Sequence, residues 1–512
     1  MAETKREIER KYDAGAGQGL PDLSGVAGVA DVIDKGVTDL DAVYYDTADQ
    51  RLARAAITLR RRTGGSDAGW HLKLPVSLTD GVRDEIQAPL SDDVPPALTG
   101  LVRSRVRDTP LVPVVRLRSA RALRHLVDAS GTLLAEASVD DVRAQRLHDG
   151  SATTAWTEIE VELAEETPPT LLDKVEKRLN KAGVRRATST SKLARALAET
   201  ADPADSRRPA RPSAPGTDDS AGSHVLAYLH AQREALVAMD PAVRQDLPDS
   251  VHQMRVATRR LRSAFKTYRK ILDRNVTDPL GEELKWLAGE LGVDRDREVL
   301  TERLTTALAD VPRTLRLGPV RARLRIWSIA GRTGSRRKTV AVLDSARYLA
   351  LLDAVDALLA DPPLREAAAA PAENALPKAV LKDFDRLAAR VDQALALAPG
   401  EERDVAMHEA RKAAKRARYA GEAAKPALGK PAKRFAKRMK AVQSVLGEHQ
   451  DSVVAREALR NLAIQAHAAG ESAYTWGLLY GREEAAAAAR ERELPEVWAR
   501  AAAPKVRSAL GG

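Results

Sequence analysis

Residues 252–262 read HQMRVATRRLR, and residues 408–418 read HEARKAAKRAR. Both stretches begin with histidine and place basic residues at the fourth, eighth, ninth and eleventh positions. The match continues downstream, where a lysine, a Leu-Gly pair and an aspartate recur with a shift of one residue: Lys285, Leu291-Gly292 and Asp296 match Lys440, Leu446-Gly447 and Asp451. Internal repetition of this kind is typical of a duplicated structural unit. It predicts two helical bundles of similar architecture, related by an approximate two-fold axis.

The basic residues of each copy share one side of an α-helix. At about 100° per residue, five of them fall within a narrow arc in the first copy: His252, Arg255, Arg259, Arg262 and Lys266. Met254, Leu261 and Phe265 lie roughly opposite and predict the face that packs on the bundle. A solvated charged face is the alternative, but no acidic residue interrupts the stripe, and adjacent cations repel one another unless an anion is bound. The repeat therefore predicts an anion-binding surface.

The rest of the chain divides into three regions. Residues 223–510 repeat Ala, Leu, Arg and Glu at helical spacing, which predicts an all-α region. Residues 201–222 are rich in Pro, Ser, Asp and Gly and predict a flexible linker. Residues 1–200 contain short segments with two-residue alternation, such as GWHLKLPV at 69–76, which predict β-strands. We therefore expect a multidomain α+β protein.

Several of the predicted strands have charged residues at every second position. Glu7, Glu9 and Lys11 share one face of a strand near the N-terminus, and 158–162 presents three glutamates in the same way. In an open sheet such a face is solvated, whereas a closed barrel turns it inward. Inside a barrel, carboxylates would hold Mg²⁺ or Mn²⁺, and Arg and Lys would bind phosphate groups. His71, His125 and His148 have no partner at metal-ligand spacing, and we expect them to be ordinary core or surface residues.

The composition narrows the classes of partner. The net charge of +10 and pI of about 9.6 favour polyanions, and the absence of cysteine excludes disulfides and thiolate metal sites. The sequence has no long apolar stretch and no apolar segment near its first residue. We interpret the chain as cytoplasmic, with no membrane partner.

The N-terminal motifs resemble those of the CYTH domain, the triphosphate tunnel metalloenzyme family. The motifs, in order, are EIERK at 7–11, YYDT at 44–47, LRRR at 59–62, WHLKLP at 70–75, RDE at 83–85, RLR at 116–118, DD at 140–141, EIEVEL at 158–163 and SK at 191–192. The resemblance covers residues 3–197 and implies an eight-stranded antiparallel β-barrel tunnel that hydrolyses a triphosphate with a divalent metal, Mg²⁺ or Mn²⁺. Nucleotide cyclisation is an alternative activity within the same family.

The resemblance also implies roles for individual residues. The implied metal ligands are Glu7 and Glu9 with one or two of Glu158, Glu160 and Glu162. The implied triphosphate-binding residues are Lys11, Arg60, Arg62, Lys73, Arg83, Arg116, Arg118 and Lys192. The implied catalytic residues are Lys73, Lys11 and Glu85.

The repeated helices resemble the CHAD domain, a conserved-histidine α-helical module associated with inorganic polyphosphate, over residues 223–505. The resemblance implies a basic channel between two bundles. Its implied polyphosphate-binding residues are His252, Arg255, Arg259, Arg262, Lys285, His408, Arg411, Lys415, Arg418, Lys437 and Lys440. His449 has no clear counterpart in the first copy, and we rank it lower.

The leading hypothesis joins metal-dependent hydrolysis of inorganic triphosphate, or a related triphosphate, to polyphosphate binding. The alternative is a non-catalytic polyphosphate-binding protein, and polyphosphate granules are a candidate location in either case. Nucleic-acid binding is disfavoured because the basic helices lack interleaved aromatic residues and no reading motif is found. The sequence leaves the oligomeric state open.

Overall fold

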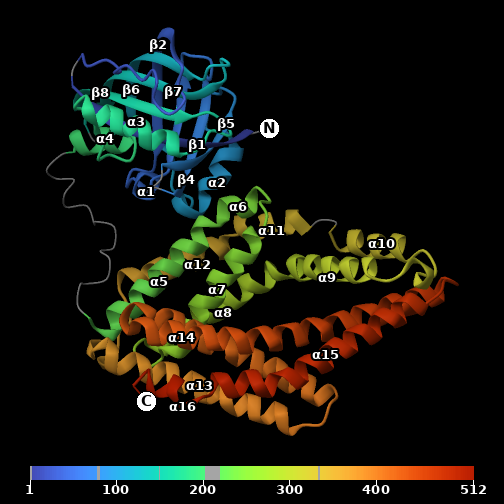
Figure 1. The fold of residues 1–512 in the computed structure, drawn as a ribbon. Helices are drawn as coiled ribbons and strands as arrows, with labels where there is room; N and C mark the ends of the chain where they lie inside the picture. Colours follow the sequence, from blue (N-terminus) through green and yellow to red (C-terminus); the bar gives the residue numbers. More distant parts are fainter. Residues whose placement is uncertain are drawn as a thin grey trace. The chain divides into compact units, whose positions relative to one another are not determined.

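The computed structural model describes residues 3–15, 17–77, 81–148, 150–201, 219–332 and 335–511. The chain divides into two compact units, Met1–Arg211 and Pro212–Gly512 (Figure 1). Most of the predicted linker at 201–222 lies outside the described residues. Its last two residues already belong to helix α5 (Ala221–Ala238) of the second unit. The predicted order of a β-barrel followed by an all-helical region is confirmed.

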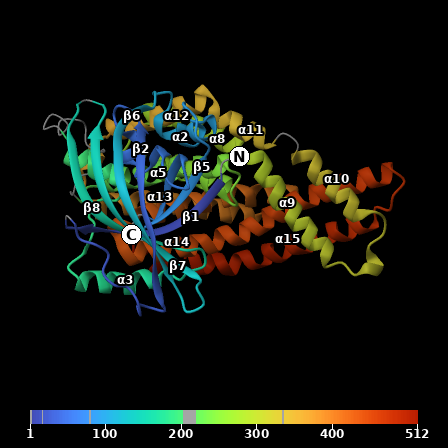
Figure 2. The same ribbon diagram turned by 90° about the horizontal axis from the view of Figure 1, so that it is seen from above.

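The first unit is a closed antiparallel barrel (Figure 2). Its strands are β1 (Glu3–Ala14), β2 (Asp31–Asp46), β3 (Thr58–Thr63), β4 (Gly69–Ser77), β5 (Val82–Ala88), β6 (Val112–Val127), β7 (Leu133–Arg146) and β8 (Thr153–Leu163). They neighbour one another in the order β5-β4-β3-β2-β6-β7-β8-β1, and β1 also pairs with β5, which closes the ring. A two-residue strand, β9 (Arg185–Arg186), pairs with β1 as well.

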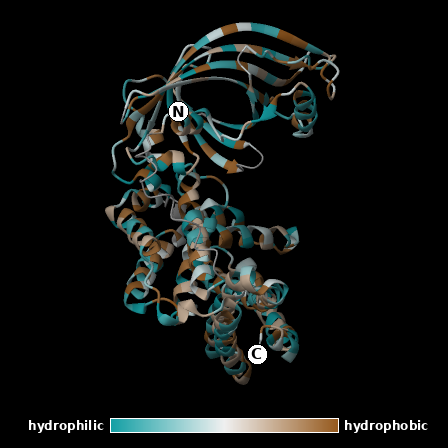
Figure 3. Cartoon of the chain, turned by 90° about the vertical axis from the view of Figure 1, so that its left-hand side faces the viewer, coloured by the Kyte–Doolittle hydropathy of each residue, from teal (hydrophilic) through white to brown (hydrophobic). Residues whose placement is uncertain are grey.

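Side-chain alternation separates an apolar outer face from a polar interior. Ile159 and Val161 of β8 point outward and pack beneath helix α3 (Thr170–Lys181). Leu59 and Leu72 do the same beneath helix α2 (Pro96–Val106), and the short helix α1 (Arg51–Arg54) adds Leu52 to this layer. Figure 3 shows the resulting alternation of brown and teal along the strands. The residues between these apolar positions therefore point into the barrel.

Helix α4 (Lys192–Glu199) closes one end of the barrel interior. Its first turn is capped by Ser191, whose hydroxyl accepts a hydrogen bond from the backbone N–H of Ala194 at 3.0 Å. Leu193 packs with the inward-facing side chains of Leu117 and Trp156. The interior is therefore apolar around Leu193, whereas Lys192 at the start of α4 reaches the charged part of the interior.

The second unit is helical throughout its described residues. Its α-helices after α5 are α6 (Asp240–Arg244), α7 (Ser250–Thr267), α8 (Arg274–Glu290), α9 (Gly292–Ala309), α10 (Val320–Arg332), α11 (Ser335–Asp344), α12 (Ala346–Ala360), α13 (Ala372–Ala396), α14 (Glu401–Ala468), α15 (Tyr474–Ala501) and α16 (Pro504–Ser508). Gly429 has a φ of 58° and bends α14 into two consecutive helices. No helix among the described residues is long and apolar enough to cross a membrane.

Two apolar cores hold these helices together. The larger core includes Leu261 of α7, Phe384 of α13 and Phe435 of α14. The smaller core joins α9 and α10 to the end of α14 and the start of α15, with Trp476 at its centre. Both repeats contribute helices to each core, because α7 and α9 belong to the first copy and the two halves of α14 belong to the second. The basic stripes lie on the faces of α7 and α14 that the cores leave uncovered.

Candidate functional site

The barrel interior gathers charged side chains from most of its strands. Nearly all the residues that the motifs predict for the tunnel lie here: Glu7, Glu9 and Lys11 on β1, Arg60 and Arg62 on β3, Lys73 on β4, Arg83 and Glu85 on β5, Glu158 and Glu160 on β8, and Lys192 on α4. The alternation of each strand, together with antiparallel pairing, turns them to the same side. Carboxylates and cations are therefore confined together in a space with little solvent.

Three carboxylates form the candidate metal centre. Asp140 on β7 and Glu158 and Glu160 on β8 each offer an oxygen atom, and these atoms lie within 4.8 Å of one another. The ammonium group of Lys192 lies 2.9, 2.7 and 2.6 Å from them, respectively. Arg121 adds contacts of 2.6 Å to Asp140 and 2.8 Å to Glu160. A buried, oxygen-only set that already attracts cations fits a hard divalent ion such as Mg²⁺ or Mn²⁺.

The two glutamates of β1 differ in their electrostatic environment. Burial raises the pKa of Glu7, although Lys73 lies 2.5 Å away and opposes this effect. Burial acts in the same direction on Glu9, but Lys11 at 3.1 Å and Lys73 outweigh it and lower the pKa of Glu9. One strand therefore presents a carboxylate that stays ionised beside a carboxyl group that holds its proton more readily. In such a pair, the ionised carboxylate can bind a metal while the other carboxyl group exchanges a proton.

A group of cations lies across the ring from the carboxylate centre, because β3 and β4 stand opposite β7 and β8 in the strand order. Burial and the neighbouring guanidinium of Arg60 lower the pKa of Arg62 to about 9. Lys73 belongs to this group and pairs with carboxylates of the two strands that follow β4 around the ring, Glu85 of β5 at 3.6 Å and Glu7 of β1 at 2.5 Å. This arrangement would place an anion between metal and cations, as phosphoryl transfer requires.

The placement of Arg116 and Arg118 differs from the expectation. Both point outward from β6, where they pair with Asp41 and where their side chains are 38% and 65% exposed. Inward-facing positions of β6 are Val115, Leu117 and Arg121, because Leu117 faces α4 and Arg121 reaches the carboxylate centre. These two arginines are therefore not brought to the interior site.

Glu162 lies outside the site, whereas Asp140 and His71, which have no predicted role, lie within it. Glu162 shares the strand face of Glu160 but pairs with Lys5 at 2.8 Å and is a quarter exposed, outside the carboxylate centre. Asp140 belongs to the DD motif at 140–141, to which the resemblance gives no role, and the alternation of β7 turns its side chain inward. His71 is a buried core residue, and its Nδ1 lies 3.0 Å from Glu85 inside the barrel. Its two-residue spacing from Lys73 was the available signal.

A second candidate site lies where the repeated helices meet. Arg255 pairs with Asp296 at 2.9 Å, and Arg411 lies 3.7 Å from Asp451, so both copies make the equivalent contact. The glycine of the Leu-Gly pair lies beside this arginine in both copies. A side-chain carbon at Gly292 would lie 2.8 Å from the guanidinium of Arg255, so glycine leaves room for this arginine in the first copy, whereas at Gly447 the distance to Arg411 would be an ordinary 3.6 Å.

Four cations gather at this site, which we call the central cluster: Arg255, Arg259, Arg411 and Lys415. Burial, together with Arg411 and Arg259, lowers the pKa of Lys415 to about 7. Burial and the neighbouring Arg255 and Arg411 also lower the pKa of Arg259. Each copy of the repeat thus supplies two cations to one place. Their mutual repulsion favours a bound anion.

The other residues predicted for polyphosphate lie around this cluster or away from it. His252 is half-buried at the start of α7, and His408 shares a 2.6 Å hydrogen bond with Gln450. Arg418 pairs with Glu422 at 2.8 Å, and Arg262 donates to the backbone oxygen of Gly281 at 3.1 Å. Lys285, Lys437 and Lys440 are exposed, and Lys285 pairs with Glu282. The structure does not join these three lysines to the central cluster.

His449 is fully buried and lies in a separate network of charged side chains. Its Nε2 atom is 3.2 Å from Asp404 and 3.4 Å from Glu491. Arg456 and Arg403 pair with the same two carboxylates at 2.7 and 3.2 Å. Because both carboxylates are already offset by arginines, we interpret this network as a structural connection between α14 and α15.

Comparison with known proteins agrees with both parts of this description. Residues 5–197 match the CYTH domain, and residues 227–460 match the CHAD domain. An uncharacterised protein of Mycobacterium tuberculosis (strain H37Rv) is 39% identical over 526 aligned residues, covering 98% of this chain and 97% of that protein. The chain therefore belongs to the proteins in which a CYTH domain is followed by a CHAD domain.

Two solved structures are similar to the chain. PptA from Streptomyces chartreusis is 24% identical, with a TM-score of 0.47, and the match covers 55% of this chain and 99% of that one. The CHAD domain from the plant Ricinus communis is 26% identical, with a TM-score of 0.43, and the match covers 58% of this chain and 96% of the Ricinus chain.

Proposed function

We propose that the barrel hydrolyses inorganic triphosphate, or a related triphosphate, with a divalent metal, and that the helical unit binds inorganic polyphosphate. The observation that supports the first part is the pairing of a buried carboxylate centre with an opposed group of cations in one closed interior. A site that only bound anions would not need three buried carboxylates with oxygen atoms within 4.8 Å of one another, because they repel the substrate.

Different residues of the barrel interior bind the metal, bind the triphosphate and accept a proton during phosphoryl transfer. Asp140, Glu158 and Glu160 would hold Mg²⁺ or Mn²⁺, which when bound neutralises charge on the phosphate oxygens. Lys73, Arg60 and Lys11 bind and orient the triphosphate, and their fixed charges stabilise the additional negative charge of the transition state. Glu7, whose raised pKa suits proton exchange near neutral pH, accepts a proton from the attacking water.

Glu85 positions Lys73. Its carboxylate lies 3.6 Å from Lys73 Nζ and 3.0 Å from Nδ1 of His71, whose other ring nitrogen lies 2.9 Å from the backbone oxygen of Asp67. The side chain of Gln87 donates a further hydrogen bond to Glu85 at 2.9 Å. A carboxylate held from several directions keeps Lys73 directed into the lumen.

The second part of the proposal rests on the central cluster. Phosphate oxygens accept charge-assisted hydrogen bonds from guanidinium and ammonium groups, and a linear polyphosphate presents such oxygens at every unit. Anion binding would also restore the proton that Lys415 holds weakly in the free protein. In this proposal the helical unit retains long polymer, and polyphosphate granules are a candidate location for the protein.

A comparison of three substrates tests the proposal. The full-length protein with Mg²⁺ or Mn²⁺ should release phosphate from tripolyphosphate faster than from a nucleoside triphosphate or long-chain polyphosphate. The alternative of a non-catalytic polyphosphate-binding protein predicts binding of the long polymer with no phosphate release from any of the three. Preference for duplex DNA or RNA over polyphosphate in a competition titration would instead contradict the role of the helical unit.

A further inference from the structure

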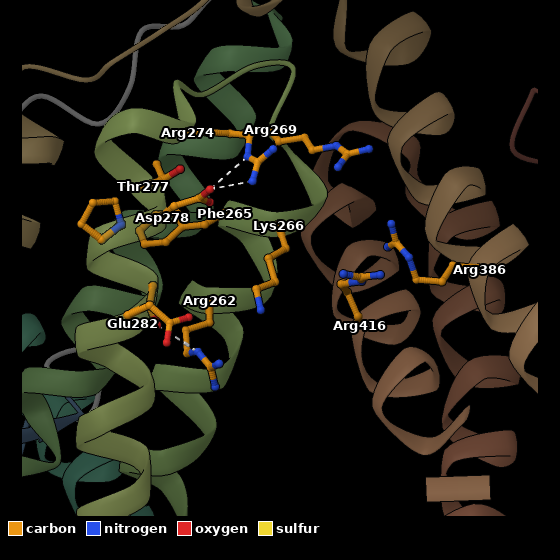
Figure 4. Close-up of a pocket in the computed structure, with 12 residues that line it drawn as sticks. Arg262, Phe265, Lys266, Arg269, Arg274, Thr277, Asp278, Glu282, Arg386 and Arg416 are labelled. Carbon is orange, nitrogen blue, oxygen red and sulfur yellow. Dashed lines mark hydrogen bonds and ion pairs between the residues drawn. The ribbon is translucent and has the colours of Figure 1, made fainter. Parts of the chain in front are cut away.

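A cavity of about 520 Å³ lies in the helical unit between α7 and α8 on one side and α13 and α14 on the other (Figure 4). Its lining includes six cations, Arg262, Lys266, Arg269, Arg274, Arg386 and Arg416, but only two carboxylates, Asp278 and Glu282. Figure 4 shows Lys266 directed into the space between the two pairs of helices, with Arg416 and Arg386 on the far wall. The cavity therefore has an excess of positive charge.

Half of these cations already have acidic partners. Arg274 pairs with Asp278 at 2.7 Å, and Arg386 and Arg416 both pair with the buried Asp383, at 2.7 and 3.0 Å. Arg262 is held by the backbone oxygen of Gly281. No carboxylate in the described part of the chain lies within ion-pair distance of Lys266. On the α7 wall, Lys266 consequently keeps an uncompensated charge, whereas Glu282 attracts the charge of Arg262.

The second copy of the repeat shows that this feature is not a general property of the fold. Arg262 corresponds to Arg418, and Lys266 corresponds to Glu422. Glu422 pairs with Arg418 at 2.8 Å and with Arg260 at 3.0 Å, so the second copy neutralises the same end of its basic stripe. Only the first copy continues its basic stripe beyond the central cluster to a cation, Lys266, that lines the cavity without an acidic partner among the described residues.

We propose that this cavity is a second phosphate-binding site, which holds a further stretch of the same polyphosphate chain that binds the central cluster. The inference rests on the proposed polyphosphate binding of the helical unit. Arg259 in the cluster and Lys266 in the cavity are separated along α7 by about 10 Å of helix rise, with Arg262 between them. A short chain occupies the cluster alone, whereas a long chain fills both sites. The polymer therefore extends from the cluster in one preferred direction, along the first copy.

The test measures how affinity depends on chain length in the full-length protein. The variants are Lys266→Ala with Arg269→Ala, and Lys266→Glu, which reproduces the residue of the second copy. Titrations with tripolyphosphate and with long-chain polyphosphate are done in EDTA, so that hydrolysis is prevented and any binding in the barrel is common to all variants. We expect long-chain affinity to fall about tenfold in both variants, while affinity for tripolyphosphate changes by less than about twofold.

A matched control removes the same charge elsewhere. Arg337→Ala with Lys338→Ala changes two exposed residues of α11 that do not line the cavity, and it should reduce long-chain affinity by less than about threefold. Equal losses in control and cavity variants would overturn the inference, as would an equal loss for tripolyphosphate. If the unmodified protein binds no polyphosphate, the proposed function itself fails. A thermal melt of each variant confirms that the fold is retained.

Discussion

Lys192 lies with its ammonium group among Asp140, Glu158 and Glu160, which we propose as metal ligands. Three buried carboxylates clustered within 4.8 Å are costly unless cations offset them, and Lys192 with Arg121 provides that charge in the protein itself. The same cluster can therefore be stabilised in two ways, by an internal lysine or by a divalent ion. Metal binding at this site should therefore change the thermal stability of the protein, which can be measured independently of its activity.

Replacing Lys192 by Ala should make the effect of metal on stability larger. Without metal, the variant should lose about 3 kcal/mol of unfolding free energy, because buried negative charge is left uncompensated. Addition of Mg²⁺ or Mn²⁺ should raise the melting temperature of the variant by more than that of the unmodified protein. Lys177→Ala, on the exposed face of α3, is the control. The metal assignment would be wrong if neither ion shifted either melting temperature.

Lys415 offers a second test, through pH. Its pKa is lowered to about 7 by burial and by Arg411 and Arg259, while a bound anion raises it again. Because binding takes up a proton only above the pKa of the free protein, polyphosphate affinity should be constant below pH 7 and fall steadily as pH rises above it. Lys415→Arg keeps its charge at every accessible pH, so the variant should bind with little dependence on pH between 6 and about 9. A pH dependence that persists in this variant would assign the titration to another group.

At the scale of elements, strand β6 decides which arginine enters the barrel. The segment VVRLRSAR alone does not establish its orientation, because arginines occupy both alternation phases. The phase is determined by tertiary contacts: Leu117 packs near α4, and Arg121 bonds to Asp140 of the neighbouring strand. By contrast, the sequence predicts the orientation of β8 because its glutamates alternate strictly with Ile159 and Val161. In β1 the inward charges also recur at every second position, although Arg10 places a further charge on the outer face.

The orientation of β6 predicts opposite results for two arginines. Arg121→Ala should reduce kcat/KM for tripolyphosphate by at least about tenfold, since it removes a largely buried cation that contacts two carboxylates of the metal centre. Arg118→Ala should change kcat/KM by less than about twofold, because the side chain is 65% exposed on the outer face. Similar losses in both variants would contradict the interior site as described.

At the scale of the whole molecule, the sequence predicts the order of the two units and the main features of the repeat, but it does not predict every site in the helical unit. The order of barrel and helical region follows from the change in sequence periodicity, and the meeting of Arg255, Arg259, Arg411 and Lys415 follows from the repeat. The sequence does not reveal the cavity beside Lys266, because four helices from distant parts of the chain line it. Nor does it reveal that Lys285 and Lys440 lie away from the cluster, since spacing alone does not distinguish a ligand from a solvated lysine.

Each unit has its own apolar cores, which predicts that each folds and acts by itself. Residues 1–211, expressed alone, should keep tripolyphosphate hydrolysis, and residues 212–512 should keep polyphosphate binding within about threefold of the full-length affinity. Hydrolysis rates and binding titrations on the separate pieces provide the measurement. Loss of either property in a folded fragment would show that the two units depend on each other.

The most direct test of the central claim is metal-dependent phosphate release from tripolyphosphate by the full-length protein and two matched variants. Glu160→Gln removes one carboxylate charge from the candidate metal centre, while Glu165→Gln makes the same change at an exposed residue just beyond β8. The account predicts turnover with Mg²⁺ or Mn²⁺, at least about a hundredfold loss for Glu160→Gln, and an unchanged rate for Glu165→Gln. Absence of turnover by the unmodified protein with either metal would contradict it, as would full activity of Glu160→Gln.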